Sequence, residues 1–222
     1  MGLINNKVNV FRNNAAPFTN ADDLLIFLGL DPRDSRNSTS ATSKNSRILV
    51  PKSFANRMRP FDLSDPLLRQ VLPIAEELEN KEGNEDPVGD EKARTDDCKV
   101  LLKKYNTRAL LLTTEKCAIR CRFCFRRNMP SDCFADDYEQ LFKAIYLLQH
   151  RTDINELILS GGDPLTLPYK ILKKFLTNLN AVKHIERIRI HTRLPVADPI
   201  RVNKEMLEVL SSAKKPLIIV LH

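Results

Sequence analysis

The 222-residue sequence has no apolar run near the roughly 20 residues that a membrane-spanning helix needs. Its N-terminus also lacks the apolar stretch of a secretory signal, and Asn6 departs from the Ser or Thr of a myristoylation signal. We therefore expect a cytoplasmic protein with no membrane partner. The net charge of +7 is spread along the chain without a helix-turn-helix, zinc-finger or RNA-binding pattern, so we expect no direct contact with nucleic acid.

The sequence also lacks a recognisable ligand set for an ordinary zinc site. It has five cysteines, which in a cytoplasmic protein favour a metal site or catalysis over disulfides. Three of them, Cys117, Cys121 and Cys124, lie within eight residues. A disulfide uses two cysteines, a structural zinc site usually uses four, and no His lies between residues 117 and 149. Cys133 is near enough to be a fourth ligand, but its spacing fits no pattern that we can assign.

The second half of the sequence alternates between strand and helix patterns. Short apolar runs of strand length occupy residues 108–115, 156–162, 187–196 and 216–222. Helical periodicity lies between them, over residues 136–150, 171–179 and 199–213. Connections of this length between strands indicate βαβ units and a parallel sheet. We expect an α/β fold that is a partial parallel (β/α) barrel of about four strands, which a longer protein or a partner would complete.

Residues 1–105 have a different pattern and form a predicted N-terminal helical and extended region, with the barrel core predicted over 106–222. A helical segment interrupted at Pro73 is expected over residues 65–79, and an extended surface segment over 80–97. Residues 31–46 form a predicted loop rich in Ser, Asn and Thr.

The cysteines follow the first predicted strand directly, in the stretch KCAIRCRFCFRR. Parallel α/β folds place their active sites in such loops, at the carboxyl ends of the strands. A CxxxCxxC spacing lets three thiolates converge on one cluster of iron and sulfide, whereas a [4Fe–4S] cube normally takes four. The missing fourth ligand leaves one iron open to a small molecule, which favours a catalytic metal site.

A second motif, LILSGGDPL, ends the second predicted strand in two glycines. Gly161 and Gly162 would allow the backbone to approach a ligand closely, and Asp163 offers an acceptor for an ammonium group. On its own, this motif is also a common turn.

Together, CxxxCxxC and SGGDP resemble the radical S-adenosylmethionine (SAM) superfamily, in which the open iron binds SAM. The segments KYNTRALLL, CRFCFRR, SGGDPL and RIRIHTRLPV resemble the lysine 2,3-aminomutase family more closely. VPKSFANRM, DPLLRQVLP and DPVGDEK extend this likeness to its bacterial elongation factor P β-lysylation branch. The resemblance covers residues 47–222 and implies a [4Fe–4S] cluster, SAM and pyridoxal phosphate (PLP) as cofactors, with (S)-lysine isomerised to (R)-β-lysine.

The resemblance also implies roles for individual residues. Ligands of the cluster would be Cys117, Cys121 and Cys124. Contacts to SAM would come from Gly161, Gly162, Asp163, Thr192, Arg193 and His222, the last of which matches the first His of an HxxH segment. Tyr105 and Arg108 match positions that hold PLP, and Lys104 stands where a basic residue meets its phosphate. Arg126 matches the position that binds the substrate carboxylate.

The same resemblance predicts partners and leaves an alternative open. A reductant such as flavodoxin or ferredoxin would supply electrons, and the product would serve the modification of elongation factor P. Relatives are often oligomeric, so a homo-oligomer is one expected state. The family's PLP lysine has no counterpart up to residue 222, so the alternative is a truncated, non-catalytic protein that binds an iron–sulfur cluster and SAM.

Overall fold

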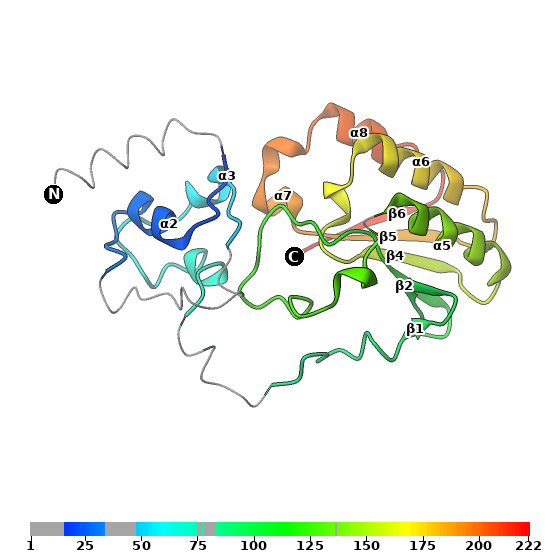
Figure 1. The fold of residues 1–222 in the computed structure, drawn as a ribbon. Coiled ribbons are helices and arrows are strands. Elements are labelled where there is room, and N and C mark those ends of the chain that lie inside the picture. The colour runs from blue at the N-terminus through cyan, green and yellow to red at the C-terminus, as the bar shows by residue number, and fades with distance from the viewer. Residues whose placement is uncertain (1–15, 34–47, 75–76, 78–82, 136) are drawn as a thin grey trace. The chain divides into compact units, whose positions relative to one another are not determined.

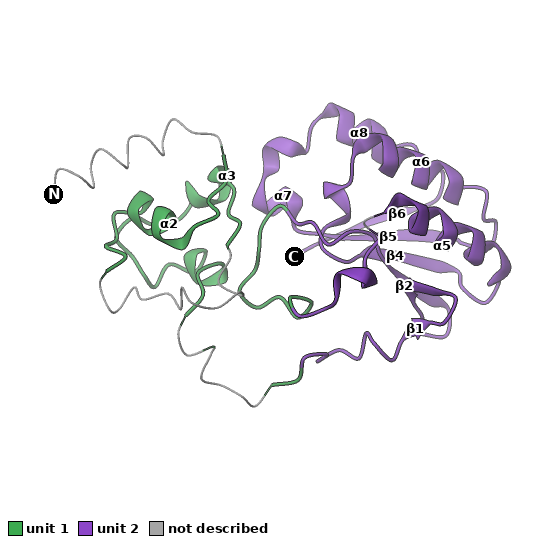
Figure 2. Cartoon of the chain, in the orientation of Figure 1, with its two compact units in different colours: residues 1–84, 118–127 green, residues 85–117, 128–222 purple. Residues whose placement is uncertain are grey.

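The structure is a computed structural model that describes residues 16–33, 48–74, 77, 83–135 and 137–222. The chain forms two compact units (Figure 2). Unit 1 consists of residues 1–84 and 118–127, and unit 2 consists of residues 85–117 and 128–222. Among the described residues, no helix is both long enough and apolar enough to cross a membrane.

Unit 1 has short helices around a small apolar core. Helix α2 (Ala21–Phe27) begins after Asn20, whose side chain accepts a hydrogen bond from the Asp22 N–H at 2.8 Å. An isolated antiparallel bridge pairs Phe18 with Val50, just before α3 (Lys52–Ala55). The core is made of fully buried side chains from these elements, among them Leu24, Leu25, Val50 and Phe54.

Of the helical segment predicted over residues 65–79 with an interruption at Pro73, the structure describes the 3-10 turn η3 (Leu68–Gln70) before the proline and a helical residue, Glu77, after it. The buried Asp65 carboxylate accepts hydrogen bonds from the N–H groups of Leu67 and Leu68, both at 2.9 Å, which fixes a tight turn. Pro73 then lacks the N–H that a continuing helix would need. Residues 75–76 and 78–79 lie outside the described residues, as does most of the predicted loop, at 34–46.

Unit 2 is built on a six-stranded sheet whose strand order follows the chain. The strands are β1 (Arg94–Thr95), β2 (Cys98–Leu102), β3 (Arg108–Leu112), β4 (Glu156–Ser160), β5 (Arg187–Thr192) and β6 (Leu217–Leu221). β1, β2 and β3 pair antiparallel, and β3 to β6 pair parallel. The four predicted parallel strands and the α/β class are therefore confirmed, as a partial (β/α) barrel.

Helices α5 (Tyr138–His150), α6 (Tyr169–Leu179) and α8 (Lys204–Leu210) lie on one face of this sheet (Figure 1). They confirm the three predicted helical segments, with residues 199–201 forming the separate 3-10 turn η6 (Pro199–Arg201). Each helix buries one apolar stripe; in α6 this stripe is Leu172, Phe175, Leu176 and Leu179.

The sequence patterns do not predict β1 and β2, which lie before residue 106 and extend the sheet at its antiparallel edge. Leu102 of β2 joins Leu110, Leu112 and Ile158 in an apolar cluster that also contains Cys133, at the end of η4 (Ser131–Cys133). The division of the chain into domains at residue 105 stays a prediction. Because β4, β5 and β6 run parallel and in register, the turns that follow them meet at one edge of the sheet.

Candidate active site

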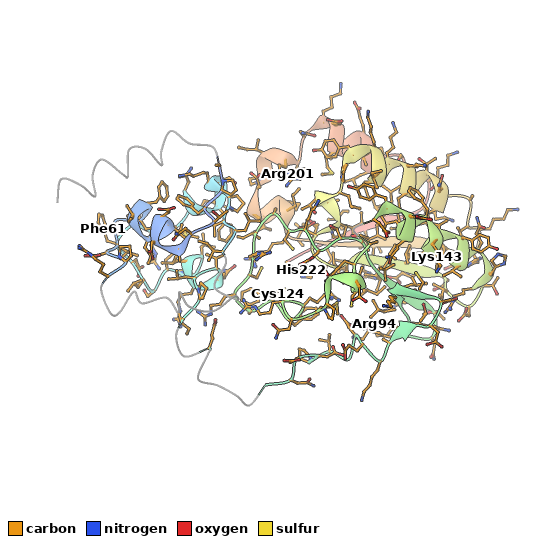
Figure 3. All side chains as sticks on the ribbon, viewed as in Figure 1. Phe61, Arg94, Cys124, Lys143, Arg201 and His222 are labelled. Atoms are coloured by element: carbon orange, nitrogen blue, oxygen red, sulfur yellow. The ribbon has the colours of Figure 1, made fainter. Side chains whose placement is uncertain are left out.

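Most of the residues predicted to contact SAM lie at the carboxyl edge of the parallel strands. Gly161, Gly162 and Asp163 follow β4, Thr192 ends β5, and His222, which is labelled in Figure 3, follows β6. The His222 N–H donates to the Thr192 carbonyl at 3.2 Å, and its ring packs edge-on against His191 with the centroids 5.4 Å apart. The fold therefore brings three consecutive strand ends together here.

The two glycines let the turn after β4 lie directly against the chain that leaves β3. A Cβ on Gly162 would stand 2.4 Å from the Lys116 carbonyl oxygen and 2.6 Å from that of Glu115. Gly161 has φ +111°, and a Cβ there would stand 2.8 Å from the Thr114 oxygen. The contact is completed by hydrogen bonds from Gly162 N–H to the Thr114 oxygen at 2.6 Å and from Asp163 N–H to the Lys116 oxygen at 2.8 Å. Side chains are thus excluded at both positions by backbone.

Asp163 is buried, with 3% of its surface exposed, and its carboxylate joins two turns. Oδ1 accepts from the Leu165 N–H at 3.0 Å, which starts η5 (Pro164–Thr166), and from the Thr192 hydroxyl at 2.7 Å. Oδ2 accepts from the N–H groups of Arg193 and Leu194, both at 2.8 Å, at the start of α7 (Leu194–Ala197). The carboxylate is therefore already hydrogen-bonded on both oxygens.

Cys121 and Cys124 lie in the segment 118–127 of unit 1, where backbone contacts fix the path of the chain (Figure 3 labels Cys124). The N–H groups of Arg120 and Arg122 donate to the carbonyls of Leu49 and Gln70 at 2.9 and 2.7 Å. Between the cysteines, Cys124 N–H donates to the Cys121 oxygen at 3.2 Å.

Arg127 adds a contact that the sequence does not indicate, because its guanidinium donates to the same Cys121 oxygen at 3.2 Å. This second arginine of the CFRR stretch therefore holds the backbone of the cysteine segment.

The chemistry of the three motif cysteines fits an iron–sulfur cluster better than that of the other two. Cys117, Cys121 and Cys124 are half-buried, whereas Cys98 and Cys133 are buried, and burial raises the pKa of both of those thiols. A raised pKa disfavours the thiolate that binds iron. Within the described residues, however, no three His, Cys, Asp or Glu side chains are grouped to hold a metal ion, so the ligand set stays a prediction.

The residues predicted to hold PLP lie at the opposite, amino end of β3. Arg108 begins the strand, with its guanidinium carbon 5.8 Å from the centre of the Tyr105 ring. The Lys104 ammonium pairs with the buried Asp90 carboxylate at 2.7 Å. Residues 108 and 112 of an extended strand are about 13 Å apart. The structure therefore does not bring these three residues to the edge where the SAM candidates lie.

A buried glutamate next to this group is a feature that the sequence patterns miss. The Glu156 carboxylate, whose side chain is 2% exposed, pairs with Arg189 at 2.7 Å, Arg108 at 3.3 Å and Arg187 at 3.7 Å. Its partners come from two neighbouring strands, β3 and β5, and Glu156 itself stands at the start of an apolar run. The arginines that face Glu156 could have been identified only from the register of the sheet.

Arg126, predicted to bind the substrate carboxylate, is half-buried in the segment 118–127. Its guanidinium carbon lies 4.5 Å from the centre of the exposed Phe125 ring, a cation–π contact. The carboxylate contact itself stays a prediction.

Comparison with known proteins agrees with this fold. The model of the Radical SAM superfamily matches residues 111–222, which is half of the chain. The chain belongs to the radical SAM superfamily, and membership implies a [4Fe–4S] cluster and SAM.

Among individual proteins, the chain is similar to L-lysine 2,3-aminomutases. That of Buchnera aphidicola is 39% identical over 205 residues, covering 92% of this chain and 60% of the relative. That of Escherichia coli is 35% identical over 205 residues, covering 92% and 59%. That of Haemophilus influenzae is 31% identical over 204 residues, covering 91% and 60%. The predicted resemblance is thus confirmed, and the chain spans about 60% of the length of these relatives.

Proposed function

We propose that this protein acts in the isomerisation of (S)-lysine to (R)-β-lysine, a 2,3-amino migration driven by radical SAM chemistry. The main support is identity of 31–39% to L-lysine 2,3-aminomutases over nine-tenths of the chain. When bound, the cluster and SAM supply the radical that removes a hydrogen atom from the substrate. The rest of the proposal concerns what the residues of this chain do.

In this proposal the thiolates of Cys117, Cys121 and Cys124 hold the cluster. The turn of Gly161, Gly162 and Asp163 presents its backbone to SAM, because a glycine leaves no Cβ between backbone and ligand. Thr192, Arg193 and His222 complete the SAM contacts from the neighbouring strand ends. Arg126 binds the substrate carboxylate, for which the planar guanidinium fork is well matched.

We include PLP as a second cofactor, which when bound stabilises the radical during amino migration. Tyr105, Arg108 and Lys104 would hold it. Arg108 uses its Nε toward Glu156, so its remaining N–H donors can serve a phosphate without breaking that pair. Lys104 would have to share its ammonium between Asp90 and the phosphate.

The wider setting is also proposed. The protein would work in the cytoplasm with flavodoxin or ferredoxin as electron donor, as a homo-oligomer in the manner of many relatives. Its β-lysine would serve the modification of elongation factor P.

The proposal can be tested on the whole chain after anaerobic reconstitution with iron and sulfide. We expect visible absorption of a thiolate-ligated iron–sulfur cluster, cleavage of SAM on reduction, and β-lysine from lysine when PLP is present. Cys121→Ala should abolish the cluster, and Cys133→Ala, a matched change at a buried thiol, should not.

The outcomes separate the alternatives. A reversed result for the two cysteine variants would show that the ligands are wrongly assigned. A cluster with SAM cleavage but no β-lysine would support a protein that binds the cluster and SAM without catalysing the migration.

A further inference from the structure

The buried Asp163 carboxylate has no acceptor position left for a ligand. A carboxylate offers about four lone-pair sites. Here the N–H groups of Leu165, Arg193 and Leu194 and the hydroxyl of Thr192 occupy them, at 2.7–3.0 Å. We propose that Asp163 is a positioning residue that clasps the turn after β4 to the turn after β5, and that it does not bind the ammonium group of SAM. This inference rests on the proposed function in one respect, namely that SAM binds at this edge.

The donors that face Asp163 explain why the carboxylate is not available. Three of them are backbone N–H groups, which cannot turn away without moving the chain. The fourth, the Thr192 hydroxyl, also accepts from the Leu194 N–H at 3.1 Å, so rotating it would break a second bond. An incoming ammonium would displace these donors, among them the Leu165 N–H, from their acceptor within a buried turn, which is costly.

The four hydrogen bonds to the Asp163 carboxylate, which we call the clasp, fix the backbone position of residues that the proposed function assigns to SAM. On one side stands Asp163 itself, directly after Gly162. The backbone of both residues packs against the Lys116 carbonyl. On the other side the clasp holds Thr192 and the backbone of Arg193. The two turns are 29 to 31 residues apart in sequence, so this single side chain determines how they lie relative to each other.

Two substitutions at Asp163 separate positioning from charge recognition. In Asp163→Asn, the amide oxygen can face the N–H groups of Arg193 and Leu194 while the amide nitrogen donates to the Thr192 hydroxyl. Only the bond to Leu165 is then lost. In Asp163→Ala all four bonds are lost. A positioning role predicts that Asn rescues most of the function, whereas recognition of an ammonium by a carboxylate predicts that both variants fail alike.

The experiment uses the whole chain and two readouts. Hydrogen–deuterium exchange of the peptide 192–197, without SAM, reports the clasp directly. Equilibrium dialysis of SAM against the reconstituted protein reports its consequence. Asp153→Ala, at an exposed carboxylate paired with Lys103, is the matched control. Thr192→Val, which removes one donor with little change of shape, serves if Asp163→Ala does not fold.

We expect Asp163→Ala to raise exchange in 192–197 about tenfold or more and to weaken SAM binding about tenfold or more, the usual effect of losing several buried hydrogen bonds. Asp163→Asn should stay within about threefold of the wild type in both, and Thr192→Val should fall between them. Equal loss of SAM binding in Asn and Ala variants, with unchanged exchange, would overturn the clasp. If the exchange changes as expected but the wild type binds no SAM, the clasp is supported and the proposed function fails.

Discussion

The two ends of the parallel strands each bury a carboxylate, but they satisfy it differently. At the carboxyl end, Asp163 accepts hydrogen bonds from three backbone N–H groups and one hydroxyl. At the amino end, Glu156 pairs with three arginines whose side chains are 28–49% exposed. Backbone donors are fixed in place, whereas partly exposed guanidinium groups can turn to water. The first arrangement therefore fixes the positions of the two turns around Asp163. The second neutralises the charge of Glu156 and tolerates substitution of that residue.

The largest expected effect comes from removing the Asp163 carboxylate, whose donors are mostly fixed backbone N–H groups. Asp163→Ala removes the carboxylate acceptor of the N–H groups of Leu165 and Arg193 and leaves the Leu194 N–H only its bond to the Thr192 hydroxyl, at 3.1 Å. We expect the free energy of unfolding to fall by about 3 kcal/mol, since each such group costs roughly 1–3 kcal/mol. Urea denaturation followed by circular dichroism measures this. A loss below about 1 kcal/mol would mean that the two turns are not held by this carboxylate.

The second effect tests the close backbone contact beside Asp163. In Gly162→Ala the new Cβ meets the carbonyl oxygens of Glu115 and Lys116 below 3 Å, so the backbone must shift. We expect a loss of about 2 kcal/mol in the free energy of unfolding, within the range for overpacking. Gly83→Ala is the control, because nothing lies within 4 Å of its added Cβ. Equal effects of the two changes would contradict the role given to this turn.

The third effect tests the amino end of the parallel strands, where Glu156 pairs with three arginines. Glu156→Leu removes the buried charge and fills its volume, while the arginines keep access to water. We expect a loss of only about 1 kcal/mol, which added salt should reduce by screening the arginines from one another. Thermal unfolding at low and high salt measures this. A loss larger than that of Asp163→Ala would reverse the comparison between the two ends.

The smallest effect concerns a third, exposed carboxylate, that of Asp153. A hydrogen bond from Lys103 lowers the pKa of Asp153. A lowered folded-state pKa gives stability that is present above the unfolded value of about 3.9 and is lost as the pH falls through the folded value. Both side chains are more than a third exposed, so Asp153→Asn should cost only a few tenths of a kcal/mol at pH 7. At about pH 2 the variant and the wild type should unfold alike in urea.

The fold could be predicted where the hydrophobic pattern was long and regular. The four parallel strands and helices α5, α6 and α8 follow from such patterns. β1 was missed because it has only two residues and lies in the charged segment 80–97, and β2 was missed because it directly follows that segment with no strand pattern before it. The short helix α7 contains Pro195 directly after a strand, so its residues read as the end of that strand.

The candidate site could be predicted only as far as local motifs extend. The cysteine and glycine motifs identify residues that lie close together in sequence. Three of the four donors to Asp163 are about 30 residues away, and the partners of Glu156 come from two neighbouring strands, so only the sheet register reveals them. The sequence therefore indicated Asp163 as an available acceptor, and the structure shows a carboxylate whose acceptor positions are filled.

The order of the sheet bears on how the protein is made. Each strand from β2 to β6 pairs with the strand that precedes it in the chain. During synthesis, every new strand can therefore dock onto a template that has already left the ribosome, and no strand must wait for a distant partner. We expect unit 2 to assemble progressively from β1 toward β6. The clasp at Asp163 would then close late, when residues 192–194 emerge and give the buried carboxylate its remaining donors.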